Sequence, residues 1–263
     1  MKQLFRTLVF VGALCTATVS QAQILNIEKN RLQKDTARVW LGTTSVTANY
    51  RRQQVEVFDL VWVANAAYLS RRHNYMFITH ANFVRVAGDN VISDAYSHGR
   101  INFVHKKPVS YEVFAQYQYD RARGLLARAL AGGGLRLKLA DGKKATLVLG
   151  PGVMWEREDW RLPDGVEGPM GRDEVNNDFV KSTTYLSLRW EPREGFAVNG
   201  IAYYQARFDT FFRPRLSGDI AATYKLNEWL AFTSRLSGQY DDAPVVAIER
   251  VNILYSNGIQ VRF

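Results

Sequence analysis

The sequence has little cysteine, little proline and no long apolar run. One cysteine among 263 residues excludes an intramolecular disulfide, and seven prolines are too few for a proline-rich stalk. The 19 glycines show no three-residue period, which excludes a collagen-like helix. No apolar segment is long enough to span a bilayer as a helix. Aromatic residues make up 13% of the chain, which is too many for a disordered protein, so a folded chain is expected.

The first 22 residues have the composition of a secretory signal peptide. A basic head precedes a short apolar run, and small residues stand at the −3 and −1 positions of a cleavage site. These features are Lys2 and Arg6, residues 8–15, and Ser20 and Ala22. A lipoprotein anchor at Cys15 is disfavoured because Leu14 precedes it, where a small residue is expected. Cleavage after residue 22 leaves a cysteine-free chain with 32 basic and 25 acidic residues, a net charge of +7. The mostly polar residues 23–36 predict a short periplasmic leader, with an insert into the barrel lumen as the alternative.

Residues 37–263 alternate apolar and polar side chains with a period of two, which is typical of β-strands. In residues 111–119, for example, Tyr111, Val113 and Tyr117 share one face, and Glu112, Gln116 and Gln118 share the other. Glu56 and Asp59 fall on opposite faces of the second strand, which predicts a bulge there. Twelve strands are predicted, at 38–50, 54–70, 74–87, 98–106, 109–121, 125–140, 143–157, 180–190, 195–207, 210–225, 228–240 and 250–263.

The connections between these strands differ in length. Those after every second strand are short and turn-like, such as Asp141-Gly142, where glycine tolerates a positive φ. Longer connections are predicted at 88–97, 158–179 and 241–249. Short turns at one end and longer loops at the other are typical of outer-membrane β-barrels.

Three features favour a membrane barrel over a soluble sandwich, which also alternates apolar and polar residues. Many predicted strands have 12 or more residues, whereas globular sheets favour about 5–6 and a tilted membrane strand needs about 9–11. The chain ends with alternating Ile259, Val261 and Phe263, which resembles the assembly signal of bacterial outer-membrane barrels. Aromatic residues gather at strand ends, as in interfacial girdles. These are Trp40, Trp155, Trp190, Phe196, Tyr224, Trp229 and Tyr240.

The predicted architecture is therefore an all-β, closed antiparallel transmembrane β-barrel. Closure is expected because an open sheet edge in lipid leaves backbone groups unpaired, at several kcal/mol each. An even strand number puts both termini on the periplasmic side and the long loops outside the cell. The expected location is the bacterial outer membrane.

Several segments are similar to the bacterial salt-induced outer-membrane proteins, a domain family of unknown function. The similarity lies in residues 24–31 with Trp40-Leu41-Gly42, in 111–120, and in 125–128 with 132–136. It covers essentially the whole mature chain. The resemblance implies an outer-membrane barrel, but it implies no activity and no functional residue.

If the apolar face meets lipid, the opposite face lines the barrel interior. The candidate basic lining residues are Arg128, Arg136, Lys138, Arg189, Arg207, Arg213, Arg215, Arg235 and Arg262. The acidic candidates are fewer, namely Glu112, Asp120, Glu156 and Asp219. Such an excess of positive charge predicts a narrow pore or transport channel with an anion preference. The alternative is a filled lumen in which Arg128, Arg213 and Arg215 pair with Asp120, Glu112 or Asp219.

Other functions receive less support from the sequence. A surface lipid hydrolase needs a nucleophile beside a base, and none of the four histidines has a serine two residues away. His80 and Asn82 share a face and are the best candidate pair. The acidic residues between 156 and 178 lack the spacing of a calcium loop, so no metal or cofactor is predicted. The expected partners are outer-membrane lipid, the barrel-assembly machinery and periplasmic chaperones, and nucleic acid is excluded by export. A non-conducting structural or envelope-stress barrel remains the first alternative.

Overall fold

The computed structural model describes residues 39–162, 165–166, 173–246 and 248–261. Within them, twelve strands form one antiparallel sheet in which each strand pairs with its neighbours in sequence. The strands are β1 (Val39–Arg52), β2 (Glu56–Leu69), β3 (Asn74–Val86), β4 (Asp89–Phe103), β5 (Val109–Asp120), β6 (Leu125–Asp141), β7 (Ala145–Arg161), β8 (Glu174–Arg193), β9 (Phe196–Arg207), β10 (Arg215–Lys225), β11 (Leu230–Asp241) and β12 (Val251–Val261). The all-β class and the twelve antiparallel strands are thus confirmed. The predicted signal peptide and leader, Arg262 and Phe263 lie outside the described residues.

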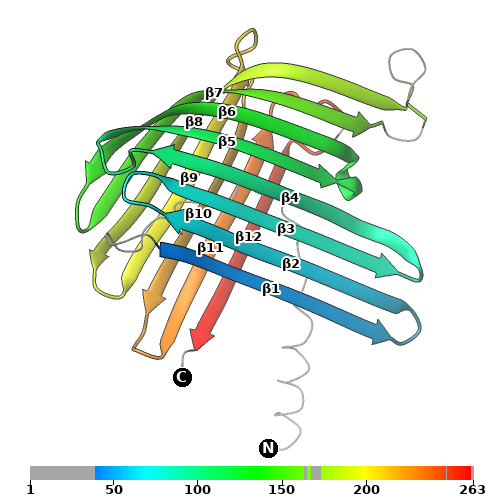
Figure 1. The fold of residues 1–263 in the computed structure, drawn as a ribbon. Helices are drawn as coiled ribbons and strands as arrows, with labels where there is room; N and C mark the ends of the chain where they lie inside the picture. Colours follow the sequence, from blue (N-terminus) through cyan, green and yellow to red (C-terminus); the bar gives the residue numbers. More distant parts are fainter. Residues whose placement is uncertain (1–38, 163–164, 167–172, 247, 262–263) are drawn as a thin grey trace, which may run out of the picture.

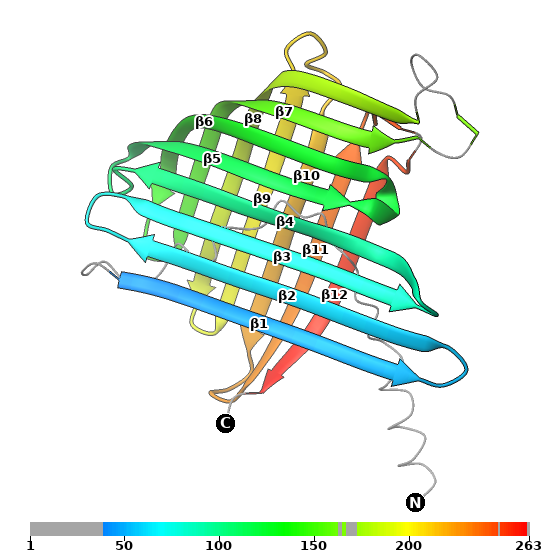
Figure 2. The same cartoon turned by 45° about the vertical axis from the view of Figure 1, so that its right-hand side comes forward.

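The sheet curls strongly, so that strands far apart in the sequence face each other. In both views the strands from β9 to β12 lie behind those from β1 to β5 (Figures 1 and 2). Within the described residues no pairing joins β1 to β12, so both are edge strands. The start of β1 and the end of β12 lie at the same end of the sheet, because the strand number is even.

The connections at this end of the sheet are short. They have two to five residues, at 70–73, 104–108, 142–144, 194–195 and 226–229. At the opposite end three connections are longer, at 162–173, 208–214 and 242–250. The predicted difference between the two ends is therefore seen. A single turn of 3₁₀-helix, η2 (Arg121–Arg123), joins β5 to β6 there.

Three predicted boundaries are wrong. Residues 89–97 of the predicted loop 88–97 lie within β4, because Ala87 and Gly88, with φ of 53° and 95°, make a two-residue turn directly after β3. The predicted loop 158–179 is shorter at both ends, because β7 continues to Arg161 and β8 begins at Glu174. The strand predicted from residue 210 begins only at Arg215, after a turn in which the Arg213 amide donates to the Thr210 carbonyl (2.9 Å).

The predicted bulge in the second strand is also wrong. The register of β1 against β2 runs unbroken from Val39↔Leu69 to Arg52↔Glu56. Asp59 does not need a bulge, because the Asn49 side chain opposite donates a hydrogen bond to its carboxylate (2.9 Å). A register shift occurs instead between Leu125 and Ala127 of β6. It changes the face of Leu125, which is buried against Trp160 and Val246 rather than on the apolar outer face.

The close approach of β6 and β7 depends on glycine. A Cβ built on Gly134 would lie 2.3 Å from the Pro151 carbonyl oxygen, so only glycine allows this backbone contact. A Cβ on Gly150 would lie 2.0 Å from the Tyr185 ring. The Tyr185 ring therefore occupies the space that a side chain at Gly150 would fill. This arrangement, in which an aromatic residue covers a glycine on the neighbouring strand, recurs in β-sheets. Together these glycines let the sheet curl around large side chains from β5 and β8.

The two faces of the curled sheet have the reverse of the usual polarity. Large apolar side chains on the outer face are exposed, such as Trp40 (74%), Ile253 (66%) and Tyr117 (54%). Most charged side chains on the inner face are buried, such as Glu112 and Arg128. Among the residues that the structure describes, no helix has the length and apolar character needed to cross a membrane.

Candidate functional site: the polar inner face

The inner face is concave, since side chains from strands that are not neighbours meet on it. The Tyr185 hydroxyl of β8 donates to Glu112 of β5 (3.0 Å), across the two intervening strands. Arg215 of β10 donates through Nη1 to Glu158 of β7 (2.7 Å). The inner face therefore forms a polar interior of the curled sheet, and the alternation along each strand decides which residues face it.

The centre of this interior is an ion network, here defined as Arg128, Glu156, Glu158, Lys181, Arg215 and Asp241. Glu156 and Glu158 are 0% and 1% exposed. Glu156 accepts from Arg128 Nε at 2.9 Å and from the Lys181 ammonium group. Three cations face three carboxylates, so the network is electrically balanced.

Both ends of the network are anchored by more than one contact. Arg128 Nε lies 3.1 Å from Glu158 Oε1, and Arg215 Nε donates to Asp241 Oδ2 (2.8 Å). Trp160 donates its indole N–H to Glu158 (3.1 Å). Burying an unpaired charge costs several kcal/mol, so such carboxylates persist in the interior only with several partners each.

An apolar cluster lies beside this network, near the end with the longer connections. Trp160 and Leu125 pack against Val246 of the connection 242–250. Arg213 Nε donates to Asp242 (2.8 Å) in the same connection, and the Tyr240 hydroxyl donates to Asp242 as well (2.8 Å). These two donors lower the pKa of the Asp242 carboxyl below its ordinary value. The connection is thus held against the inner face by apolar packing and by an ion pair.

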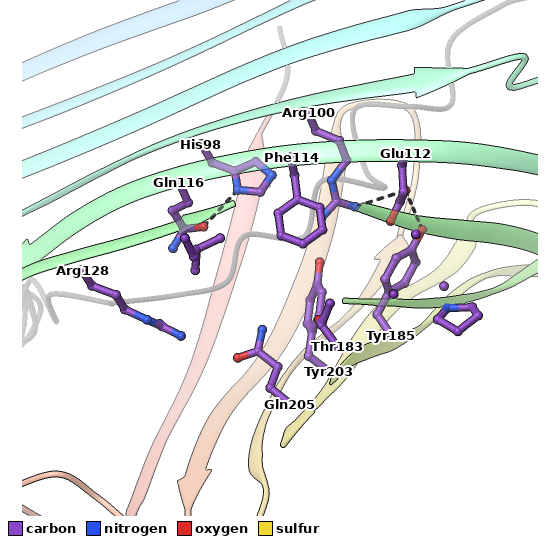
Figure 3. Close-up of a pocket in the computed structure, with 15 residues that line it drawn as sticks. His98, Arg100, Glu112, Phe114, Gln116, Arg128, Thr183, Tyr185, Tyr203 and Gln205 are labelled. Carbon is purple, nitrogen blue, oxygen red and sulfur yellow. Dashed lines mark hydrogen bonds and ion pairs between the residues drawn. The ribbon is translucent and has the colours of Figure 1, made fainter. Parts of the chain in front are cut away.

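A small cavity borders the network on the side of β4, β5 and β8 (Figure 3). His98 Nδ1 lies 3.0 Å from Gln116 Oε1, and Arg100 lies 3.7 Å from Glu112. Both pairs are drawn with dashed lines in Figure 3. The cavity volume of about 30 Å³ is enough for about one or two water molecules and for no larger solute. This half of the interior is therefore filled.

The comparison with known families assigns the chain. The family model described as "Protein of unknown function, DUF481" matches residues 42–263. The chain belongs to this family. The predicted membership of a domain family of unknown function is thus confirmed, and the DUF481 description itself names no location. Among curated proteins no match to the chain is found.

Most of the predicted lining residues of this DUF481 member lie on the inner face. Six of them are buried there, namely Glu112, Asp120, Arg128, Arg136, Arg215 and Asp219. Four are partly buried, namely Lys138, Arg189, Arg207 and Arg235. Arg213 is exposed in the connection before β10, so its predicted place in a strand is wrong. The predicted terminal residues Ile259 and Val261 lie on the outer face of β12 and are exposed.

The predicted ion pairs are wrong in every case. Arg128 and Arg215 pair with Glu156 and Glu158, and Arg213 pairs with Asp242. Glu112 instead forms an ion pair with Arg100 and accepts a hydrogen bond from Tyr185. Asp219 accepts hydrogen bonds from Arg235 (2.5 Å) and Ser237 (2.7 Å). For Arg215 the reason is the curl, which brings β10 against β7, whereas Arg128 pairs across the neighbouring strands β6 and β7. The strand period identifies only the face of a residue and not its partner.

Sequence reasoning missed Arg100, Glu158, Lys181 and Asp241 as interior residues. Glu158 and Asp241 were assigned to loops, and Arg100 lies in a strand whose start was placed nine residues too late. A period-two signal was present for two of them. Met154, Glu156 and Glu158 alternate without a break into β7, as do Tyr96, His98 and Arg100 in β4.

The pair His80 and Asn82 shares the inner face with Asp94. His80 Nε2 lies 3.8 Å from Asp94, and the Asn82 amide donates to the same carboxylate (3.2 Å). The neighbouring hydroxyl groups of Thr79 and Ser97 bond to each other on the outer face (2.9 Å). In the part of the chain that the structure describes, no group of three or more His, Cys, Asp and Glu side chains is arranged to hold a metal ion.

Proposed function

We propose that this DUF481 protein is an outer-membrane β-barrel that closes by pairing β1 with β12 and contains a narrow pore. The observation that carries the proposal is the reversed polarity of the two faces. Exposed apolar side chains on every part of the outer face are unfavourable in water and favourable in lipid. An uncovered sheet edge is costly in lipid, so the two edge strands would pair with each other.

The aromatic residues support the same orientation. At the end with short turns, Trp40, Tyr68 and Tyr75 form a ladder on the outer face of β1 to β3, with ring centroids 4.8 Å and 5.9 Å apart. At the other end, Phe58 packs against Phe83, with ring centroids 6.4 Å apart. Two aromatic bands at opposite ends of the strands are the arrangement found at the two membrane interfaces. The short turns would then face the periplasm.

The anion preference predicted from the sequence is not part of this proposal. It rested on nine basic and four acidic lining residues, and the interior also contains two further acids, Glu158 and Asp241, and two further bases, Arg100 and Lys181, all four in ion pairs. Arg207 and Arg213 also have partners, in Asp209 and Asp242. With its cations neutralised by neighbouring carboxylates, the interior would show little selectivity for the sign of an ion.

The test is to refold the mature chain into a planar lipid bilayer and record conductance with a KCl gradient. A heat-modifiable band on a gel shows independently that the barrel has formed. Discrete conductance steps with a reversal potential near zero are expected. A folded but silent protein would contradict the pore. A strongly anion-biased reversal potential would restore the preference that the sequence predicts.

The buried ion network favours a second candidate, a non-conducting structural barrel. Glu156 and Glu158 with their cations fill one half of the interior, as such networks do in plugged barrels. In this case a deletion strain would lose envelope integrity with unchanged uptake of solutes. The same bilayer recording distinguishes the two candidates.

A further inference from the structure

The inner face of the four strands nearest the two sheet edges differs from the rest of the interior. The register identifies its residues. Thr47 is opposite Val61, which is opposite Asn82, and Asn82 is buried on the inner face. On the other edge, Ser237 is buried on the inner face and lies opposite Leu254. Alternate residues from these positions therefore face inward in β1, β2, β11 and β12.

Most of these inward residues are short and uncharged. We call this set the edge lining: Thr43, Ser45, Thr47, Asn49, Val61, Val63, Asn65, Thr233, Ser237, Leu254, Ser256 and Gly258. Its polar groups are hydroxyls and amides, which both donate and accept hydrogen bonds. Asn65 donates to Thr43 across β1 and β2 (3.4 Å), so some of these groups already bond to one another.

Two charged groups on the same inward rows, Asp59 and Arg235, are engaged by neighbours, and Arg51 lies at the far end of β1. Asp59 accepts from Asn49 (2.9 Å), and Arg235 donates to Asp219 (2.5 Å). The edge lining is also more exposed than the rest of the interior, because within the described residues β1 and β12 each lack a partner strand on one side. Ser45, Thr47 and Ser256 are exposed, whereas Glu156 in the ion network is fully buried.

These observations separate the interior into two halves that differ in the space they leave for a solute. In the half formed by β5 to β8 and β10, the ion network and the cavity of about 30 Å³ leave no room for a solute. Closure of β1 onto β12 would place the edge lining on the part of the interior that the ion network does not occupy. A solute that crosses the barrel would therefore exchange hydrogen bonds with water for hydrogen bonds with hydroxyl and amide groups.

We infer that the solute path runs along the edge lining, and that it favours small uncharged polar solutes, such as short polyols, over dianions of similar size, while K⁺ and Cl⁻ still pass. The inference rests on the proposed barrel and specifies its path and substrate class. Hydroxyl and amide groups replace the hydrogen bonds that a polyol makes with water. They do not repay the much larger hydration energy of a dianion, since they carry no net charge.

The path is tested with single cysteines in the mature chain, which has no other cysteine once the predicted signal peptide is removed. Ser45→Cys and Ser256→Cys place a thiol on the edge lining. Val46→Cys and Tyr255→Cys, one residue away, place it on the outer face. Ser187→Cys places it in the filled half, where Ser187 is 3% exposed. A water-soluble, negatively charged methanethiosulfonate is then added during the bilayer recording.

At least a twofold fall in conductance is expected for Ser45→Cys and Ser256→Cys, and no change for the other three variants. The path would be overturned if the reagent lowers the conductance of Ser187→Cys channels, or if it leaves the conductance of both edge-lining variants unchanged. Either result would leave the pore proposal standing, because the channels still conduct. A folded protein that never conducts would overturn the path and the pore together.

The substrate class is tested by swelling of liposomes that contain the wild-type protein. The four-carbon polyol erythritol is expected to enter several-fold faster than the four-carbon dianion succinate. A matched liposome without protein gives the background rate for each solute. Faster entry of succinate would overturn the inference even if Ser45 and Ser256 lie on the path.

Discussion

The two halves of the inner face achieve a polar interior in different ways. Around β7, charged side chains are fully buried and each has several partners, so this half is rigid and filled. Along β1 and β12, short neutral side chains on the inner face remain exposed. The difference shows that a polar lining alone does not make a path, because a balanced ion network occupies the space that it lines.

The largest effect is expected from breaking the ion network at Glu156. Glu156→Gln leaves Arg128, Lys181 and Arg215 with one negative partner fewer in a buried site. A loss of about 3–5 kcal/mol in the free energy of unfolding is expected, measured by urea titration of the folded protein in detergent micelles. The control is Glu191→Gln, since the Glu191 pair with Arg189 is partly exposed (2.9 Å) and is worth about 1 kcal/mol or less. Equal effects of the two variants would show that the network is not buried.

A smaller loss is expected from Gly150→Ala, which places a methyl group against the Tyr185 ring. Overpacking of this kind costs about 1–3 kcal/mol, again measured by urea unfolding. Gly99→Ala is the matched control in a strand, because nothing lies within 4 Å of a Cβ at Gly99. Gly99→Ala should leave stability unchanged or slightly raised. An equally mild effect of Gly150→Ala would contradict the close packing of Tyr185 on β7.

The connection 242–250 should respond to pH through Asp242. Its pKa is lowered by the hydrogen bonds from Arg213 and Tyr240, so the ion pair forms above the folded-state pKa. The stabilisation is present above the ordinary aspartate pKa of 3.8 and is lost only as pH falls through the lower folded value. A spin label at Ala243→Cys should therefore keep constant mobility from pH 8 to about 5. In Asp242→Asn it should be more mobile throughout, and mobility that rises already near pH 6 would contradict the assignment.

The smallest effects on stability are expected along the edge lining. Ser45→Ala and Ser256→Ala remove exposed hydroxyl groups, so each should change the free energy of unfolding by about 0.5 kcal/mol or less. Losses comparable to that of Glu156→Gln would show that these residues are packed rather than open, and the contrast between the two halves would then disappear.

The sequence predicts the strand number, the antiparallel order and the face of most interior residues, because a period of two persists over long strands. It fails where local signals are weak. The turn at Ala87-Gly88 lacks the usual Asn-Gly or Asp-Gly pair, and the polar residues Asp89 and Asn90 resemble a loop. Ion pairs such as Arg215 with Glu158 are 57 residues apart in sequence and depend on the curl of the sheet. Close backbone contacts such as that of Gly134 with Pro151 are likewise not contained in a pattern of apolar and polar residues.

The central claim, closure of β1 onto β12, is tested most directly by disulfide cross-linking in the outer membrane of intact cells. Ser45→Cys is combined in turn with Leu254→Cys, Ser256→Cys and Gly258→Cys, all inward-facing, in a mature chain without other cysteines. Paired strands bring opposite Cα atoms within about 5.5 Å, a distance that a disulfide can span. The account predicts an intramolecular disulfide in at least one of the three pairs, seen as a reduction-sensitive change in gel mobility of the monomer. Only intermolecular dimers, or no cross-link in a protein that is folded in the membrane, would contradict it.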